Sequence, residues 1–112
     1  MVRIDEQFKF RVYEIVAQIP KGRVMTYGQV AAAAGAAWAA WEVGQLAHRG
    51  PTDLPWQRVV NKDGGLAKGY PGGFSGHKTA LEKEGVEIDE DFKVDIERLL
   101  WHPPHKDQSS LL

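Results

Sequence analysis

The chain has 112 residues and no cysteine, which excludes disulfides, thiolate metal sites and any mechanism with a cysteine nucleophile. Its length predicts a single domain, residues 1–105, with a disordered tail at 106–112, and no apolar run approaches the roughly 20 residues that span a bilayer. The net charge of −1 is unevenly spread, because residues 1–80 hold ten Lys/Arg against six Asp/Glu, whereas residues 81–112 hold four against nine. A basic body with an acidic tail leaves nucleic acid open as a partner.

The first predicted element is an amphipathic helix that ends at Pro20-Lys21-Gly22. Its apolar residues recur at helical spacing and therefore share one face. They are Phe8, Val12, Ile15, Val16 and Ile19.

The next two predicted elements form a helix-turn-helix unit. Thr26, followed three residues later by Gln29, is a capping-box pattern that predicts a short helix through Ala34. Gly35 fits the position just beyond the end of this helix. The proline-free, alanine-rich stretch 36–48 predicts a further helix, and two short helices joined by a glycine-containing turn are typical of helix-turn-helix units.

The two faces of the predicted helix 36–48 differ in character. The face expected to pack on the core comprises Ala36, Ala39, Val43 and Leu46. The opposite face comprises Trp38, Trp41, Gln45 and His48. Because exposed tryptophans are costly in water, we expect Trp38 to fold back onto the first helix or onto the acidic C-terminal segment.

The second half of the chain predicts a small β wing followed by a helix. Residues 58–60 predict a strand, and the Asp63-Gly64 turn leads back through Leu66 as a β-ribbon. A glycine-rich loop follows at 69–76. The last predicted elements are a helix over 76–84 and two short strands over 86–88 and 93–96. The fold class expected from these elements is mainly α with a small β wing, a winged-helix-like helix-turn-helix domain.

The most specific motif is the stretch from Pro55 to Asn61, Pro-Trp-Gln-Arg-Val-Val-Asn. It resembles the Pro-Cys-His-Arg-Val signature of O6-alkylguanine-DNA alkyltransferases, and resembles even more closely the Pro-Trp-x-Arg-Val of alkyltransferase-like proteins. Further segments resemble the same family in the same order, namely Ile19–Gly22, Thr26–Ala31, Val43-Gly44, Gly69–Gly73, Leu81–Gly85 and Trp101–Pro103. Each segment alone is a weak match, but their shared order and spacing make the resemblance specific.

This resemblance implies a fold similar to winged-helix proteins, with the recognition helix in the minor groove and the damaged nucleotide flipped out of the base stack. The implied partner is double-stranded DNA that contains O6-alkylguanine. The residues implied for the alkylguanine pocket are Tyr27, Trp56, Val59, Tyr70, Pro71 and Gly72. Those implied for contact with DNA are Tyr27, Gly35, Ala36, Trp41, Gly44, Gln45 and Lys62. Those expected to hold the motif in place are Pro55, Arg58 and Glu84.

The groups that perform alkyl transfer are missing from the matched positions. Transfer needs a thiolate, activated by a histidine that a glutamate orients. Here Trp56 occupies the position of the nucleophile and Gln57 that of the histidine, and only Glu84 matches. An indole is not a useful nucleophile at neutral pH, so we expect a DNA-binding protein that is not an enzyme. With no membrane-spanning run and no obvious dimerisation element, we also expect it to be cytoplasmic and monomeric. The resemblance implies that it marks O6-alkylguanine for nucleotide excision repair.

The sequence departs from the family's pattern at three places. Trp41 replaces the arginine that fills the gap left by a flipped base; it can act as an apolar wedge between bases but cannot hydrogen-bond the unpaired cytosine. The asparagine that braces the active-site loop has no counterpart within Gly50–Leu54. The pocket loop is also one residue longer before Tyr70.

An alternative function is that of a winged-helix transcriptional regulator that binds undamaged DNA. Against it, the outward helix face lacks, apart from Gln45, the Arg, Asn or Gln side chains that read base edges in the major groove.

No metal or cofactor is expected, because the closely spaced histidines His102 and His105 have no neighbouring carboxylate or thiol.

Overall fold

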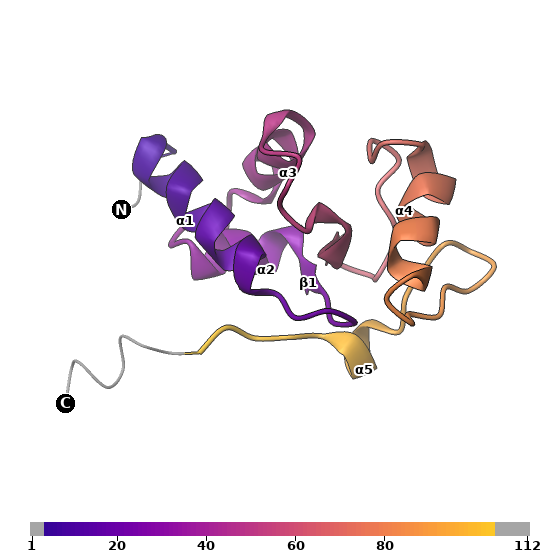
Figure 1. Ribbon diagram of the computed structural model, residues 1–112. Helices are drawn as coiled ribbons and strands as arrows, with labels where there is room; N and C mark the ends of the chain where they lie inside the picture. Colours follow the sequence, from indigo (N-terminus) through magenta and orange to yellow (C-terminus); the bar gives the residue numbers. More distant parts are fainter. Residues whose placement is uncertain (1–3, 105–112) are drawn as a thin grey trace.

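The computed structural model describes residues 4–104, so the predicted tail at 106–112 lies outside the described residues. The elements in chain order are α1 (Glu6–Gln18), β1 (Met25–Thr26), α2 (Tyr27–Ala33), α3 (Ala40–Arg49), the 3-10 turn η1 (Trp56–Arg58), β2 (Val59–Val60), α4 (Gly73–Glu82) and α5 (Ile96–Leu99). The three N-terminal helices lie together, and α4 lies at the other end of the molecule (Figure 1). A mainly helical domain with a small sheet confirms the predicted fold class. Within residues 4–104, no helix is both long enough and apolar enough to cross a membrane.

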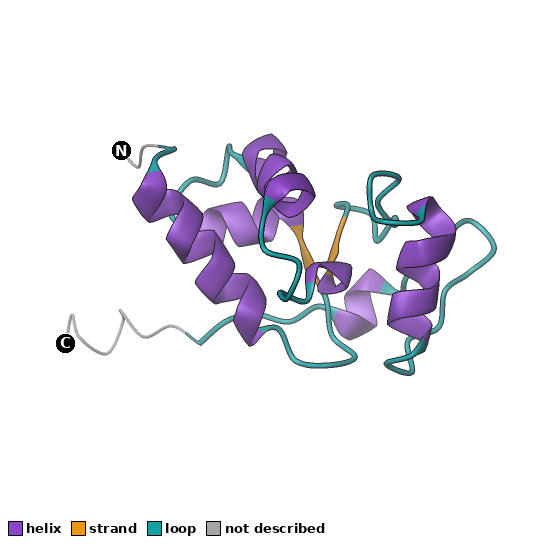
Figure 2. Ribbon diagram, turned by 45° about the horizontal axis from the view of Figure 1, so that its top comes forward, coloured by secondary structure: helices purple, strands orange, loops and turns teal. Residues whose placement is uncertain are grey.

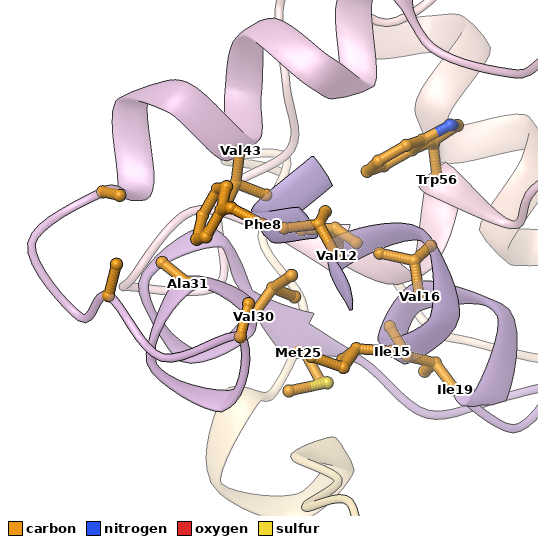
Figure 3. Packing of buried hydrophobic residues seen from close by; sticks show 14 residues of the cluster. Phe8, Val12, Ile15, Val16, Ile19, Met25, Val30, Ala31, Val43 and Trp56 are labelled. Atoms are coloured by element: carbon orange, nitrogen blue, oxygen red, sulfur yellow. The ribbon is translucent and has the colours of Figure 1, made fainter. Parts of the chain in front are cut away.

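The larger of two apolar clusters forms around the predicted face of α1. Asp5 caps the helix, since its carboxylate accepts a hydrogen bond from the N–H of Phe8 at 3.1 Å. All five residues of the predicted face are buried, and they meet Val30 of α2, Val43 of α3 and the indole of Trp56 (Figure 3). Burial of each large side chain contributes about 1.5–3 kcal/mol, so this cluster fixes α2 and α3 against α1.

The predicted capping box at the start of α2 is confirmed. The hydroxyl of Thr26 accepts from the N–H of Gln29 at 3.0 Å, and the Gln29 side chain accepts from the N–H of Thr26 at 3.0 Å. These reciprocal bonds satisfy two donors that a helix start leaves unpaired. They fix the direction in which α2 starts, and with it the position of its first residue, Tyr27.

The predicted start of the third helix is wrong, because α3 begins at Ala40 rather than at Ala36. The N–H of Ala36 returns to the carbonyl of Ala31 at 2.9 Å, and the N–H of Ala39 bonds the carbonyl of Ala36 at 2.9 Å. These bonds form a separate turn that brings both alanines into the core. Alanine favours helices by propensity, but here tertiary packing of two small side chains outweighs that preference.

The prediction that Trp38 folds back is also wrong. Trp38 lies in the turn before α3 and is 60% exposed. The tryptophan that does pack on the α1 cluster from the C-terminal segment is Trp101.

The small sheet is parallel rather than a hairpin. Strand β2 pairs with β1, with Met25 opposite Val59 and Thr26 opposite Val60 (Figure 2). The chain does turn after β2, where the N–H of Gly64 donates to the carbonyl of Asn61 at 2.8 Å. The N–H of Asn61 donates across this turn to the carbonyl of Gly65 at 2.9 Å, so the predicted tight turn is present. Beyond it the returning chain pairs with residues 92–93, so the predicted β-ribbon through Leu66 is wrong.

The C-terminal part of the chain also differs from its predicted pattern. The predicted strands at 86–88 and 93–96 are wrong: this stretch contains only an isolated antiparallel bridge between Gly65 and Lys93, followed by the short helix α5. Helix α4 begins at Gly73, three residues earlier than predicted. The N–H of Leu66 donates to the carbonyl of Phe92 at 2.9 Å, so the later segment supplies the pairing that the predicted hairpin lacks.

The acidic C-terminal segment is bonded along β1. The N–H of Val24 donates to the carbonyl of Leu99 at 3.0 Å, and the N–H of Trp101 donates to the carbonyl of Val24 at 2.8 Å. The guanidinium of Arg23 donates to the carbonyls of Leu99 and Leu100. Both views place α5 and this segment on the side of the molecule opposite to α3 (Figures 1 and 2).

Candidate functional site

A cavity of about 1040 Å³ lies between α3 and the loop that precedes α4. Small-molecule sites in proteins span roughly 300–1,000 Å³, so the cavity is ample for a purine that bears an adduct. The predicted site residues that line it are Tyr27, Trp41, Gly44, Gln45, Trp56, Tyr70 and Pro71. These residues come from α2, α3, η1 and the 67–71 loop, so the fold brings distant parts of the sequence to one opening.

The remaining predicted site residues lie elsewhere. Val59 is fully buried in β2 and Ala36 is buried in the core, and neither lines the cavity, so their contact with a base or with DNA stays a prediction. Gly72 does not line the cavity; its φ of 85° places it in the left-handed region at the start of α4. Gly35 lies exposed in the turn after α2. Exposed Lys62 lines a second cavity of about 700 Å³ on the other side of Tyr27.

The indole of Trp56 belongs both to the core and to the cavity wall. It is 7% exposed and lies at the edge of the α1 cluster (Figure 3). It packs edge-to-face with Tyr13, with ring centroids 6.2 Å apart. Its Nε1–H donates to the carbonyl of Pro51 at 2.9 Å, which fixes the ring in one orientation. A Cβ at Gly50 would lie 2.4 Å from the carbonyl oxygen of Leu46, so only glycine lets the loop pass this close behind the indole.

The carboxylate of Glu84 accepts hydrogen bonds from two other segments, the turn after α1 and the 3-10 turn η1. Oε1 accepts from the N–H of Gly22 at 2.9 Å, and Oε2 accepts from the side chain of Gln57 at 2.8 Å. The Nε of Arg58 donates to both oxygens at 3.0 and 3.1 Å, and its Nη1 donates to the carbonyl of Ile19 at 2.7 Å. Burial acts to raise the pKa of Glu84, but the hydrogen bonds from Arg58, Gly22 and Gln57 outweigh it and hold this pKa below its ordinary value.

His77 is a site residue that the sequence did not single out. It is fully buried; its Nδ1 accepts from the N–H of Ala67 at 2.9 Å and its Nε2 lies 2.8 Å from the carbonyl of Gln57. These partners require a neutral ring with the proton on Nε2. Its ring also stacks on Tyr70, with centroids 4.7 Å apart. Burial lowers the pKa of His77, although the hydrogen bond to Gln57 acts in the opposite direction.

The polar groups at the cavity are suited to hydrogen bonding rather than to nucleophilic chemistry. Burial raises the pKa of Tyr27, and burial together with the charge of Glu84 raises the pKa of Tyr70. Both phenols therefore stay protonated at neutral pH and can donate. Exposed Arg49 and Lys68 stand at the rim. The described part of the chain holds no group of three His, Cys, Asp or Glu side chains placed to bind a metal ion.

These features define a class of protein. It is a helix-turn-helix domain with a cavity, large enough for a base, between α3 and the glycine-rich loop before α4. Residues 7–86 match the family model of the 6-O-methylguanine DNA methyltransferase, DNA binding domain. The chain belongs to this family.

The chain is similar to relatives of two kinds. It is 40% identical over 100 residues to the DNA base-flipping protein of Escherichia coli (strain K12), which covers 88% of this chain and 77% of that protein. It is 38% identical over 109 residues to Alkyltransferase-like protein 1 of Schizosaccharomyces pombe, which covers 91% of this chain and all of the relative, 100%. Over 83 residues it is 36% identical to a Methylated-DNA--protein-cysteine methyltransferase of Methanothermobacter thermautotrophicus, covering 74% of this chain and 47% of that protein.

The solved structures agree with this placement. The crystal structure of S. pombe Atl1 in complex with damaged DNA containing O6-carboxymethylguanine matches with a TM-score of 0.80 and 36% identity. The match covers 91% of this chain and 100% of the other. A second crystal structure of the S. pombe protein in complex with DNA matches with a TM-score of 0.82 at 37% identity.

Replacing Glu84 with alanine should destabilise the fold strongly. The change leaves Arg58, Gln57 and the N–H of Gly22 without their shared acceptor, and breaking such a buried pair costs about 3 kcal/mol. Denaturant unfolding measures the loss. Glu82→Ala, which removes an exposed carboxylate at the last residue of α4, two positions before Glu84, is the control and should change stability by less than about 0.5 kcal/mol. Equal losses of stability in the two variants would show that the Glu84 hydrogen-bond network contributes little to the fold.

The neutral state of His77 predicts a pH dependence of stability. The unfolded chain takes up a proton on this residue below about pH 6.5, whereas the folded protein resists it. The free energy of unfolding should therefore fall as pH drops below about 6.5, by up to about 1.4 kcal/mol per pH unit until the folded pKa is reached. His77→Gln should flatten the dependence between about pH 7.5 and 5.5. Exposed His48→Gln should retain it, and a wild-type stability that is flat over this range would contradict the assignment.

Proposed function

We propose that the chain binds double-stranded DNA that contains O6-alkylguanine and holds the flipped nucleotide in the cavity without removing the alkyl group. The observation that supports this most strongly is the position of Trp56, which stands where the family's enzymes have their reactive cysteine and forms part of the cavity wall. The similarity to the S. pombe protein in complex with damaged DNA supports the same function.

In this function α3 enters the minor groove and Trp41 takes the space left by the flipped base. Trp41 is 71% exposed and also lines the cavity, so it stands at the entrance rather than inside. An apolar wedge of this kind unstacks neighbouring bases and favours an extrahelical nucleotide. Tyr27, at the opposite wall, is placed to contact the phosphate of the rotated nucleotide.

The cavity offers a flat apolar surface for a base and an alkyl group. Trp56 and Pro71 supply apolar walls, and Tyr70, held by its stacking on His77, closes the loop side. Stacking of a base on an aromatic side chain contributes roughly 1–3 kcal/mol. An adduct at O6 adds apolar area to the base, so the damaged base gains more from these walls than guanine does.

The site has no means of transferring the alkyl group. The chain has no cysteine, and Gln57, at the position of the activating histidine, is hydrogen-bonded to Glu84 and has no basic nitrogen. A protein that holds a lesion in this state leaves its removal to another system. Marking the lesion for nucleotide excision repair is part of the proposal.

Trp56→Ala should reduce the preference for damaged DNA. Affinities are compared at fixed salt for one short duplex with and without a single O6-methylguanine. We expect the wild type to prefer the damaged duplex, and the variant to lose roughly 5- to 100-fold of that preference with the lost stacking surface. Trp101→Ala is the matched control, because Trp101 packs on the same cluster but lines neither cavity. A wild type that binds both duplexes equally would end the proposal.

Trp41→Ala should weaken binding to the damaged duplex by about tenfold or more, since the gap in the base stack is then left empty. Trp41→Arg should restore binding and add a preference for cytosine opposite the lesion, because a guanidinium can hydrogen-bond the unpaired base. Titrations with each of the four opposing bases measure both effects. Unchanged affinity of Trp41→Ala would place this side chain outside the interface.

A further inference from the structure

A second large aromatic side chain stands beside Trp41 without a partner in the described part of the chain. Trp38 is 60% exposed and precedes the first residue of α3 by two positions. Ala36 and Ala39 on either side of it are buried, and the N–H of Ala39 bonds the carbonyl of Ala36 at 2.9 Å. The turn is therefore anchored from within, and the indole of Trp38 is held outward.

The same region is poor in charge. No charged residue occurs between Arg23 and Glu42, so α2, the turn and the start of α3 cannot neutralise phosphates. The cations near the two cavities are Arg49, Lys62 and Lys68, all exposed. Electrostatic contacts usually supply much of the affinity of DNA-binding proteins. Because few cations lie here, another kind of contact must contribute to the affinity for DNA.

We propose that Trp38 is a second DNA-contacting side chain, which packs against sugars and bases of the minor groove next to the flipped nucleotide. This assignment rests on the proposed function and extends it, because Trp38 supplies affinity for the groove rather than selection of the lesion. Its contact is apolar and independent of the cavity, so it strengthens binding to damaged and undamaged DNA alike. Trp38 and Trp41 together replace cationic contacts by aromatic ones.

Position, more than exposure, distinguishes Trp38 from the other exposed aromatic side chains. Phe10 is equally exposed at 61% but lies on α1, with Tyr13 at its edge and the Lys9 ammonium 5.5 Å from its ring centroid. Trp38 is continuous with the cavity entrance through Ala40 and Trp41, which both line it. Trp38 lies in the turn that leads directly into Ala40 and Trp41, so docking of the start of α3 in the groove brings this turn close to the same groove.

The test is a pair of binding titrations with Trp38→Ala, on the same duplex with and without O6-methylguanine. We expect about tenfold weaker binding to both duplexes and an unchanged ratio between them. Trp38→Phe should keep most of the affinity, and Phe10→Ala, the matched control, should bind as the wild type does. Thermal unfolding should show that Trp38→Ala folds normally, because the side chain is on the surface.

The salt dependence gives a second measurement. With three cations near the site, the slope of log affinity against log salt should have a magnitude of roughly 3 or less, and Trp38→Ala should leave it unchanged. In a Trp41→Phe background, Trp38 is the most exposed remaining tryptophan. Bound DNA should then protect its fluorescence from quenching by acrylamide.

The outcomes separate the two proposals. If the wild type prefers damaged DNA but Trp38→Ala binds like the wild type, the Trp38 contact is overturned and the proposed function stands. If the wild type shows no preference and Trp38→Ala still weakens binding to both duplexes, lesion recognition fails while the groove contact holds. Unimpaired quenching of Trp38 in the complex would also overturn the contact.

Discussion

The fold of the site depends on one buried carboxylate. Glu84 joins the turn after α1, the 55–60 motif and the end of α4, which are brought together by no continuous helix or strand. Its side chain is 8% exposed and that of Arg58 19%, so removal of either partner would leave an uncompensated polar group inside. The resemblance implies that the family's enzymes use this glutamate to orient a catalytic histidine. In this chain the same residue holds η1, and with it Trp56, against the core.

A second buried polar group supports the wall of the cavity from behind. His77 bonds the 67–71 loop and the carbonyl of Gln57 in one neutral form, and it supports Tyr70 by stacking. Gln57 is therefore held at its side chain by Glu84 and at its backbone by His77. Such doubly fixed segments lose little freedom when a ligand enters, so the cavity is formed before any base occupies it. A site that only holds its ligand benefits directly from that rigidity.

The sequence predicted the features that depend on local chemistry. The α1 face and the capping box at Thr26 follow from spacing and from hydrogen bonds within a few residues, and the structure confirms both. The predicted burial of Ala36, Ala39 and Val43 is confirmed as well. The features that failed depend on distant partners. Strand β2 pairs with β1 rather than with the chain that follows it, and residues 36–39 form a separate turn although they favour helix. His77 acquires its role only from a loop and a motif that the fold brings to it.

The distribution of charge shows how a chain of net charge −1 presents a face to DNA. The end of its acidic C-terminal segment, Leu99–Trp101, is bonded to Val24 on the side away from α3, and Arg23 donates to the carbonyls of Leu99 and Leu100. The two shorter dimensions of the molecule are 28 and 23 Å, whereas the Debye length at physiological salt is about 8 Å. Repulsion from carboxylates on that side is therefore largely screened at α3, whereas Asp63 and Asp91 line the second cavity together with Lys62. The turn and the start of α3, from Ala36 to Trp41, form an uncharged surface of alanines and tryptophans beside the cationic rim residues Arg49 and Lys68, and a base stack is a better partner for this surface than a phosphate.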